Sequence, residues 1–193
     1  NQTILKSDDI YVPPQKLGAQ NSAAGNTANQ GAGTLFAYQE NKGDTVANQD
    51  IENADVTRSS NAETIFVNEA AGNAISKKQG DAKVVQHSKG DVVAQQTGRD
   101  LDLDNWAGSA LKNQAAGNTV TVENGDAKLI QKNKGNVTAT QTAENLGEIV
   151  DLRNSAAGNQ AVLTSGTMKA YQENKGEVTA SQTIRNGIDV IAN

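Results

Sequence analysis

The chain has 193 residues, of which 3% are aromatic and 36% hydrophobic, with 18 glycines and a formal net charge of −5. This composition excludes an ordinary globular core of Phe, Leu, Ile and Met, and it leaves either disorder or a repetitive β-structure with an interior rich in small side chains and amides. The 17 basic and 22 acidic residues are mixed along the chain, which indicates no basic footprint for nucleic acid and no polybasic patch for an anionic membrane.

The absence of cysteine excludes disulfides and thiolate metal sites. The chain starts at Asn1 rather than Met, so we expect that a signal peptide has been removed and that the protein is secreted. An artificially trimmed start is the alternative. No segment reaches the roughly 20 apolar residues of a membrane helix, so we expect no membrane insertion.

Residues 1–20 form a non-repeat N-terminal segment, in which Ile4, Leu5 and Ile10–Val12 favour a short strand that ends at Pro13 and Pro14. Two roles are open for this strand. It could pair with a neighbouring subunit by strand addition, or it could cap the first coil of its own chain.

Residues 21–193 contain one motif four times. The 29-residue units 21–49, 68–96, 113–141 and 154–182 align without gaps, and only the connectors between them differ in length. Each unit contains the tetrad A-A-G-N and ends in a second block that reads Q-K-N-K-G-N-V-T-A-T-Q in the third copy. Disorder would not require fixed spacing, so the repeat predicts a folded array.

One half of the second block is nearly invariant. Every second residue from Ala127 to Gln141 of the third copy barely changes between copies, whereas the residues between them vary and are often charged. Because side chains alternate between the two faces of a strand, we expect the invariant set to face inward. Stacked at the strand spacing, the inward amides would form hydrogen-bonded ladders. The predicted ladder residues are Asn21, Asn68, Asn113, Asn154, Gln39, Gln86, Gln131, Gln172, Gln49, Gln96, Gln141 and Gln182.

Glycines recur at fixed positions, where they would supply the positive φ or the close backbone approach of a corner. The predicted corner glycines are Gly25, Gly72, Gly117, Gly158, Gly33, Gly80, Gly125, Gly166, Gly43, Gly90, Gly135 and Gly176. No apolar period of 3.6 residues persists, so we expect essentially no helix. The sequence therefore predicts an all-β fold, a β-solenoid of four repeats of 41–47 residues with short strands, in which each repeat makes either two coils or one large coil.

The pattern Q-x-N-K-G-x-V-x-A-x-Q resembles the curlin-type repeat, and A-A-G-N with G-x-V-T-A-x-Q-T is similar to the holdfast-attachment proteins of stalked bacteria. The resemblance extends over residues 21–193. It implies a secreted, cell-surface subunit of a functional-amyloid-type fibre, used in adhesion or as a biofilm scaffold. It also implies that the main partner is the protein itself, with surface-anchoring or secretion proteins as further partners.

The C-terminal residues show no polar cap, and an uncapped strand edge recruits another strand. Head-to-tail contacts that do not close produce filaments, so we expect a homopolymer formed by end-to-end stacking or by strand exchange. The expected intersubunit contacts are Ile4, Leu5, Ile10, Tyr11, Val12, Ile188 and Val190.

Residues suited to catalysis are scarce. His87 is the single histidine and takes a variable, outward position, which argues against a triad or a metal cluster. Asp100, Asp102 and Asp104 alternate beside Trp106 and could bind Ca²⁺ or sugar, although a solvated charged edge explains them better. Trp106 either fills a bulge or makes a lateral contact. We expect no catalytic, cofactor or metal site and no enzyme.

Two outward stripes are candidate contact surfaces. Tyr38, Val85, Ile130 and Tyr171 form an apolar stripe that would either meet another protofilament or be covered by a connector. Thr and Ser residues of the last two copies form a partial flat array, which is the basis of the alternative function, a module that binds ice or glycan. The array consists of Thr138, Thr140, Thr142, Thr179, Ser181 and Thr183.

Overall fold

The computed structural model describes residues 2–7, 17–56, 64–103, 109–146, 150–185 and 191–192. These residues form fourteen strands and no helix, and all the strand pairs are parallel. The prediction of an all-β chain without helix is therefore confirmed for the described residues.

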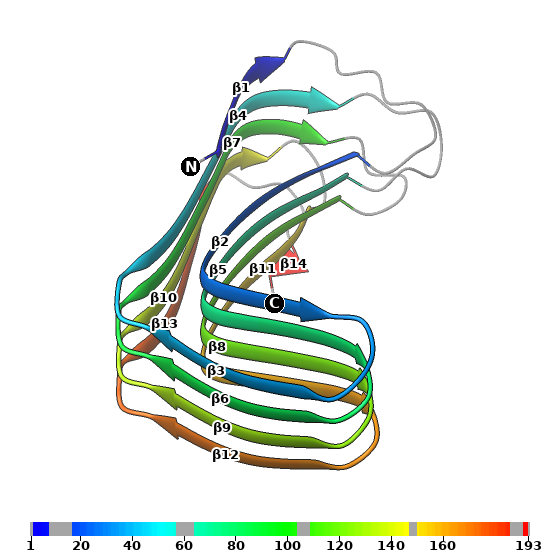
Figure 1. Cartoon of the computed structure of the whole chain (residues 1–193). Coiled ribbons are helices and arrows are strands. Elements are labelled where there is room, and N and C mark those ends of the chain that lie inside the picture. The colour runs from blue at the N-terminus through cyan, green and yellow to red at the C-terminus, as the bar shows by residue number, and fades with distance from the viewer. Residues whose placement is uncertain are drawn as a thin grey trace.

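The strands belong to three sheets (Figure 1). Sheet I consists of β1 (Gln2–Ser7), β4 (Thr45–Val56), β7 (Val92–Leu103), β10 (Val137–Leu146) and β13 (Val178–Arg185). Sheet II consists of β2 (Leu17–Gln30), β5 (Thr64–Gln79), β8 (Ser109–Asn124), β11 (Val150–Ser165) and β14 (Ile191–Ala192). Sheet III consists of β3 (Leu35–Asn41), β6 (Ala82–Ser88), β9 (Ala127–Asn133) and β12 (Met168–Asn174).

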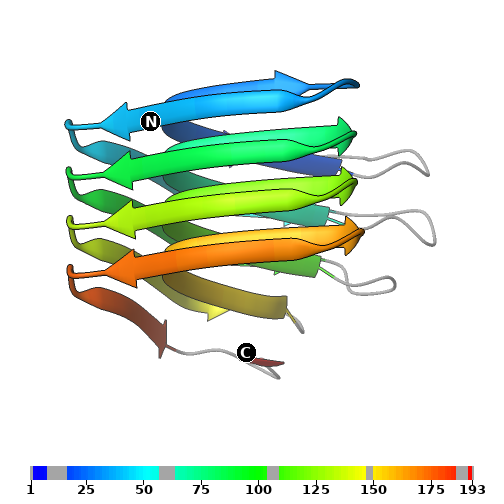
Figure 2. The same cartoon turned by 60° about the horizontal axis from the view of Figure 1, so that its bottom comes forward.

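Each repeat contributes one strand to each sheet. We call the three strands of one repeat a rung, and the four rungs lie on one another in layers (Figure 2). The register places each residue beside its equivalent in the next repeat, as in Asn68↔Asn113, Gln86↔Gln131 and Ala94↔Ala139. Of the two options left by the sequence, one large turn of the chain per repeat is therefore correct.

The long strands of sheet II bend within their length (Figure 1). In β5 the buried side chains are the even-numbered ones up to Ala70 and the odd-numbered ones from Asn73 onward, so the inward face changes phase at Gly72. The bend lets one half of sheet II face sheet I and the other half face sheet III. Side chains of facing strands meet in two small cores.

Both cores are built from aliphatic side chains. One cluster between sheets I and II consists of Ala and Val, including Ala94, Val137 and Ala139, each 0% exposed. Larger side chains are also buried on these two sheets, at Ile51, Leu101, Leu111, Leu146 and Leu152. The core between sheets II and III holds larger residues such as Ile75 and Leu129. Small alanine side chains leave space between the sheets, and buried Asn and Gln side chains occupy it. One charge also lies inside: Lys77 is 0% exposed and donates to the carbonyl of Gln79.

The glycines serve two purposes. Gly33, Gly80, Gly125 and Gly166 lie in the turns between sheets II and III with φ of +89°, +99°, +136° and +124°, where a side chain would be strained. Gly43, Gly90, Gly135 and Gly176 stack at the turn between sheets III and I.

The tetrad glycines Gly25, Gly72, Gly117 and Gly158 were expected at corners between strands, but they lie inside the sheet II strands, at the change of phase. Glycine is required here because there is no space for a Cβ atom, and not because of a positive φ. A Cβ on Gly117 would lie 2.4 Å from both the Gly158 carbonyl oxygen and Oδ1 of Asn133.

The two terminal strands extend the stack unequally. β1 pairs in parallel with β4, with Gln2 beside Gln49 and Ile4 beside Ile51. The backbone that carries Ile4 and Leu5 therefore lies on the first rung of its own chain, which is the capping role rather than the exchange role. β14 pairs with β11 at two positions. The other expected contact residues, Ile10, Tyr11, Val12, Ile188 and Val190, lie outside the described residues.

Replacing Gly117 with Ala tests the space requirement. We expect Gly117→Ala to lower the free energy of unfolding by about 1–3 kcal/mol, because the added methyl group displaces the Asn133 amide or separates two rungs. Gly31→Ala is the matched control, since nothing lies within 4 Å of its Cβ position. Urea denaturation measures both. Equal stability of the two variants would contradict the close approach at Gly117.

Candidate functional site

Two glutamine ladders cross the rungs. Gln172 Nε2 donates to Gln131 Oε1 at 2.6 Å, Gln131 to Gln86 at 2.9 Å, and Gln86 to Gln39 at 2.9 Å. In sheet I, a second ladder of Gln182, Gln141, Gln96 and Gln49 has three bonds of 2.7 Å. In both ladders every donor points toward the N-terminal rung.

The asparagine ladders have the opposite polarity. Asn21 Nδ2 donates to Asn68 Oδ1 at 2.7 Å, and the chain of bonds continues through Asn113 to Asn154 at 2.9 Å per step. The twelve amides predicted from the sequence thus make these three ladders, and Gln86, Asn68 and Gln131 are 0% exposed. Buried amides would be costly alone, so the ladders make stacking and burial dependent on each other.

A fourth ladder was missed by the sequence reasoning. The tetrad asparagines Asn26, Asn73, Asn118 and Asn159 are joined by bonds of 2.7, 2.8 and 2.7 Å, again with donors toward the C-terminal rung. The invariance of the tetrad was the signal that could have revealed it. The prediction of corners at the tetrad glycines left these asparagines without an inward position.

A fifth row is interrupted. Asn133 Nδ2 donates to Asn174 Oδ1 at 2.8 Å, but in the second rung Ser88 replaces the asparagine. The serine side chain is too short to continue the row. Ser88 Oγ and Asn133 Oδ1 are both buried and have no hydrogen-bond partner among the described residues.

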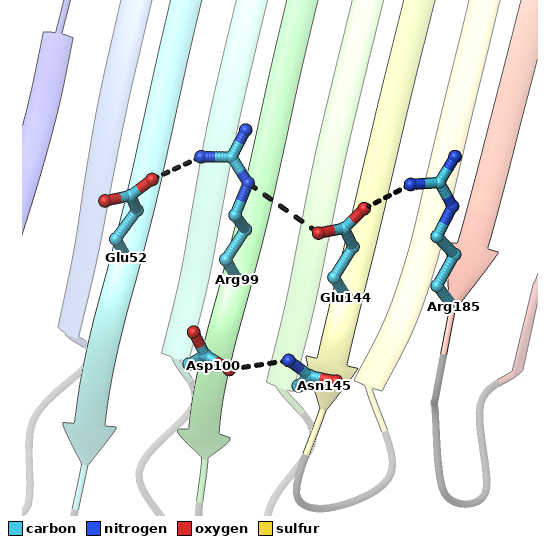
Figure 3. Close-up of polar contacts among 6 residues, drawn as sticks. All are labelled: Glu52, Arg99, Asp100, Glu144, Asn145 and Arg185. Carbon is cyan, nitrogen blue, oxygen red and sulfur yellow. Dashed lines mark hydrogen bonds and ion pairs between the residues drawn. The ribbon is translucent and has the colours of Figure 1, made fainter.

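Alternating charges line the outer face of sheet I (Figure 3). Glu52, Arg99, Glu144 and Arg185 occupy one register row on β4, β7, β10 and β13. Arg99 hydrogen-bonds Glu52 and lies 3.8 Å from Glu144, which accepts from Arg185 at 2.9 Å. The hydrogen bond to Glu52 raises the pKa of Arg99. Exposed pairs of this kind stabilise weakly, so their main effect is to favour one register.

The last rung presents its inward side chains to solvent. Val178 is 39% exposed, whereas its equivalents Val137 and Val92 are both 0% exposed. Gln172 and Asn174 are also exposed, although Gln131 and Asn133 in the preceding rung are buried. The strands β12 and β13 have a neighbour on one side only, within the described part of the chain. The fourth rung therefore carries the same inward residues as the buried rungs, but exposes them to solvent.

Sheet III carries four of the eight exposed large apolar side chains among the described residues. Phe36, Tyr38, Ile130 and Tyr171 are 69%, 64%, 42% and 57% exposed. They line an open groove of about 750 Å³ together with Val85 and the row Lys83, Lys128 and Lys169. The predicted apolar stripe is therefore open to solvent, and the alternative in which a connector covers it is wrong.

The remaining sequence candidates do not come together as one site. His87 is half-buried on β6, where its ring makes an edge contact with Tyr38 at 5.7 Å between centroids. Asp100 has a φ of +50° and accepts from Asn145 at 2.7 Å (Figure 3). The Asp102 side chain, Asp104 and Trp106 lie outside what the structure describes.

The threonine array pairs in register on two rungs, as in Thr138↔Thr179 and Thr142↔Thr183. Val46 and Val93 continue the first row in the other two rungs, so the flat hydroxyl surface does not extend along the molecule.

Among the described residues, no three His, Cys, Asp or Glu side chains form a group that could hold a metal ion. The same residues contain no helix able to cross a membrane. Comparison with known proteins found no matching family model, no matching curated protein and no matching solved structure.

Gln131→Leu is expected to destabilise the molecule by about 2–4 kcal/mol, because it leaves the buried Gln86 Oε1 without its donor and also removes the bond to the Gln160 carbonyl. Gln172→Leu is the control in the same row, where the side chain is exposed and only the bond to Gln131 is lost. Chemical denaturation should show the larger loss for Gln131→Leu, and a larger loss for Gln172→Leu would contradict a ladder held together by burial.

Ser88→Asn should repair the interrupted row. The new amide is expected to donate to Asn133 Oδ1 or to accept from Asn41, and to raise the free energy of unfolding by about 1–2 kcal/mol. The melting temperature and urea midpoint measure this change. Ser88→Ala removes the unpaired hydroxyl without adding an amide. If Ser88→Asn stabilises the protein no more than Ser88→Ala does, the new amide has not joined the row.

Proposed function

We propose that this chain is a β-solenoid of four rungs and a structural subunit of an extracellular bacterial fibre, used in adhesion or as a biofilm scaffold, in which molecules stack end to end. The observation that carries the proposal is the match between the two ends of the amide ladders. The polarity of each ladder is constant through the molecule. Each ladder therefore presents a side-chain acceptor on one terminal rung and a side-chain donor on the other.

The glutamine rows illustrate the match. At the fourth rung, the Oε1 atoms of Gln172 and Gln182 accept no hydrogen bond from any described residue. At the first rung, Gln39 Nε2 has a single acceptor, the Ala74 carbonyl at 3.5 Å. A second molecule placed in register below the fourth rung would bring its Gln39 amide to Gln172 and would continue the row.

The asparagine row and the alternating charge row of sheet I agree with this arrangement. Asn154 Nδ2 would donate to Asn21 Oδ1 of the next molecule, which is the polarity of the ladder within one chain. Arg185 would lie beside the next Glu52, so the alternation of charges continues across the junction. Three rows oppose it, because Glu173, Lys175 and Glu177 would meet the next Glu40, Lys42 and Asp44. In two of these rows the charges are already paired within one molecule, since Lys175 lies beside Glu173 and Lys42 beside Glu40.

Stacking also has an apolar component. Val178 is 39% exposed and would become buried as Val137 is, and the alanines of β12 and β13 would follow. Burial of apolar area contributes about 25 cal/mol per Å². Several small side chains buried at one junction therefore contribute together to the free energy of association. Interfaces that repeat head to tail without closing generate filaments.

The strand β1 occupies the edge that such stacking needs. Residues Gln2-Thr3-Ile4 are identical to Gln182-Thr183-Ile184 of β13, and β1 lies on β4 in the register that a neighbour's β13 would take. End-to-end stacking therefore requires β1 to leave β4, and β14 to leave β11. Strand exchange makes the opposite demand, that β1 pairs with a neighbour. The extracellular setting rests on the resemblance to curlin-type repeats.

Electron microscopy of the purified chain over time tests the proposal. We expect unbranched filaments with an axial repeat of roughly 1.9 nm, four strand spacings. Removal of residues 1–14 is expected to shorten the lag before filaments appear, because it frees the β4 edge. If the truncated chain forms no filaments, end-to-end stacking is replaced by strand exchange, and if the full chain stays monomeric, the fibre proposal fails.

A pair of valine variants separates the stacking interface from general effects. Val178→Asp places a charge where the junction would bury it and should block growth. Val162→Asp adds the same charge in the same rung, at a side chain that is 45% exposed on the outer face of β11, and should leave growth unchanged. Circular dichroism checks that both variants keep their β-structure. Equal growth of the two variants would contradict burial of Val178.

A further inference from the structure

The outer face of sheet III and its following turn concentrate positive charge in a protein whose net charge is −5. Eight of the 17 basic residues lie there, against five carboxylates: Glu40 and Glu173 on the strands and Asp44, Asp91 and Glu177 in the turns. The lysines are Lys42, Lys83, Lys89, Lys128, Lys132, Lys134, Lys169 and Lys175. Whole-chain composition indicated no polybasic patch, and it missed this one because lysines 41–47 residues apart in sequence become neighbours on adjacent rungs.

Seven of these eight lysines form two columns along the stack. Lys83, Lys128 and Lys169 make the first, and none of them has an ion-pair partner among the described residues; Lys83 lies over the Phe36 ring at 5.0 Å. The second column lies at the turn after sheet III, where every repeat has a lysine. Six residues separate the columns along a strand, which is roughly 20 Å.

Exposed apolar side chains lie between the two columns. Tyr38, Val85, Ile130 and Tyr171 occupy one register row, and this row forms one wall of the groove whose other wall is the first lysine column.

The two carboxylates on the strands of sheet III pair with lysines outside the first column. Lys89 hydrogen-bonds Glu40 and Lys175 hydrogen-bonds Glu173, and these contacts lower the pKa of both carboxyls. The carboxylates at the rims, such as Asp91 and Asp126, accept backbone N–H groups of the next rung. The first lysine column therefore keeps its full charge.

We propose that the outer face of sheet III is a docking surface for an anionic phospholipid bilayer, which it meets as a flat face without inserting. The lysine columns contact acidic headgroups, and the Tyr38–Tyr171 row enters the interfacial region between them. Amphipathic tyrosines and lysines suit this boundary, because their apolar parts are buried while the polar ends stay hydrated.

The shape of the face decides between possible partners. A linear polyanion would follow one lysine column and leave the other about 20 Å away unused, whereas a bilayer is extended in two dimensions and meets both columns and the apolar row together. A second copy of the chain through the same face would bring eight lysines against eight, which disfavours that pairing.

Flotation with vesicles tests the proposal on the monomeric fraction of the full chain, so the result does not depend on fibre formation. We expect binding to vesicles of phosphatidylglycerol mixed with phosphatidylcholine, weakening as salt is raised, and no binding to phosphatidylcholine alone. The triple variant Lys83→Gln, Lys128→Gln, Lys169→Gln should bind roughly 100-fold more weakly, at about one kcal/mol per lysine.

The matched control removes three positive charges from sheet II instead, through Lys78→Gln, Lys112→Gln and Arg153→Gln on β5, β8 and β11. This control should keep most of the affinity for phosphatidylglycerol vesicles. Equal loss in both triple variants would overturn the assignment to sheet III. Binding to soluble heparin without binding to phosphatidylglycerol vesicles would overturn the bilayer in favour of a linear polyanion.

Discussion

The hydrogen bond from one buried side-chain amide to the same amide in the next repeat is the interaction on which the rest of the structure depends. Bonds of 2.6–2.9 Å join Gln39, Gln86, Gln131 and Gln172 in a single row. An amide inside a protein must be paired, and only an in-register copy of the same residue offers both a donor and an acceptor at the strand spacing. A slip of one residue would unpair every row at once and turn the buried set outward, so the ladders specify register more strongly than the small Ala and Val cores could.

The same geometry explains the glycines and the asymmetric ends. Rungs as close as those at Gly117, where a methyl group would lie 2.4 Å from the Gly158 carbonyl, leave no space for a side chain. A stack that satisfies each rung through its neighbours leaves the outermost rung unsatisfied, as the 39% exposure of Val178 shows. β1 covers one edge at one end with a sequence that matches β13. In the proposed fibre, the interactions that hold a molecule together are therefore also those that join two molecules.

Stacking also creates surfaces that no single repeat possesses. Each repeat carries one to three lysines on sheet III and its following turn, but the stacked rungs bring most of them into two columns beside an apolar row. The alternation of Glu52, Arg99, Glu144 and Arg185 on sheet I arises in the same way from residues that differ between repeats (Figure 3). Variable positions thus carry the surface properties, and invariant positions carry the fold.

The sequence by itself determined the repeat, the all-β class and the twelve inward amides, because a period of two within strands and fixed spacing between repeats are local properties of the chain. Only the tertiary structure decided that each repeat makes one rung, since the bend inside a sheet II strand is marked only by one glycine, such as Gly72, where the inward face changes phase. It also decided the Asn26 ladder, the buried Lys77 and the lysine columns. These features depend on contacts between residues 41–47 positions apart in sequence, and such residues become neighbours only when the rungs stack.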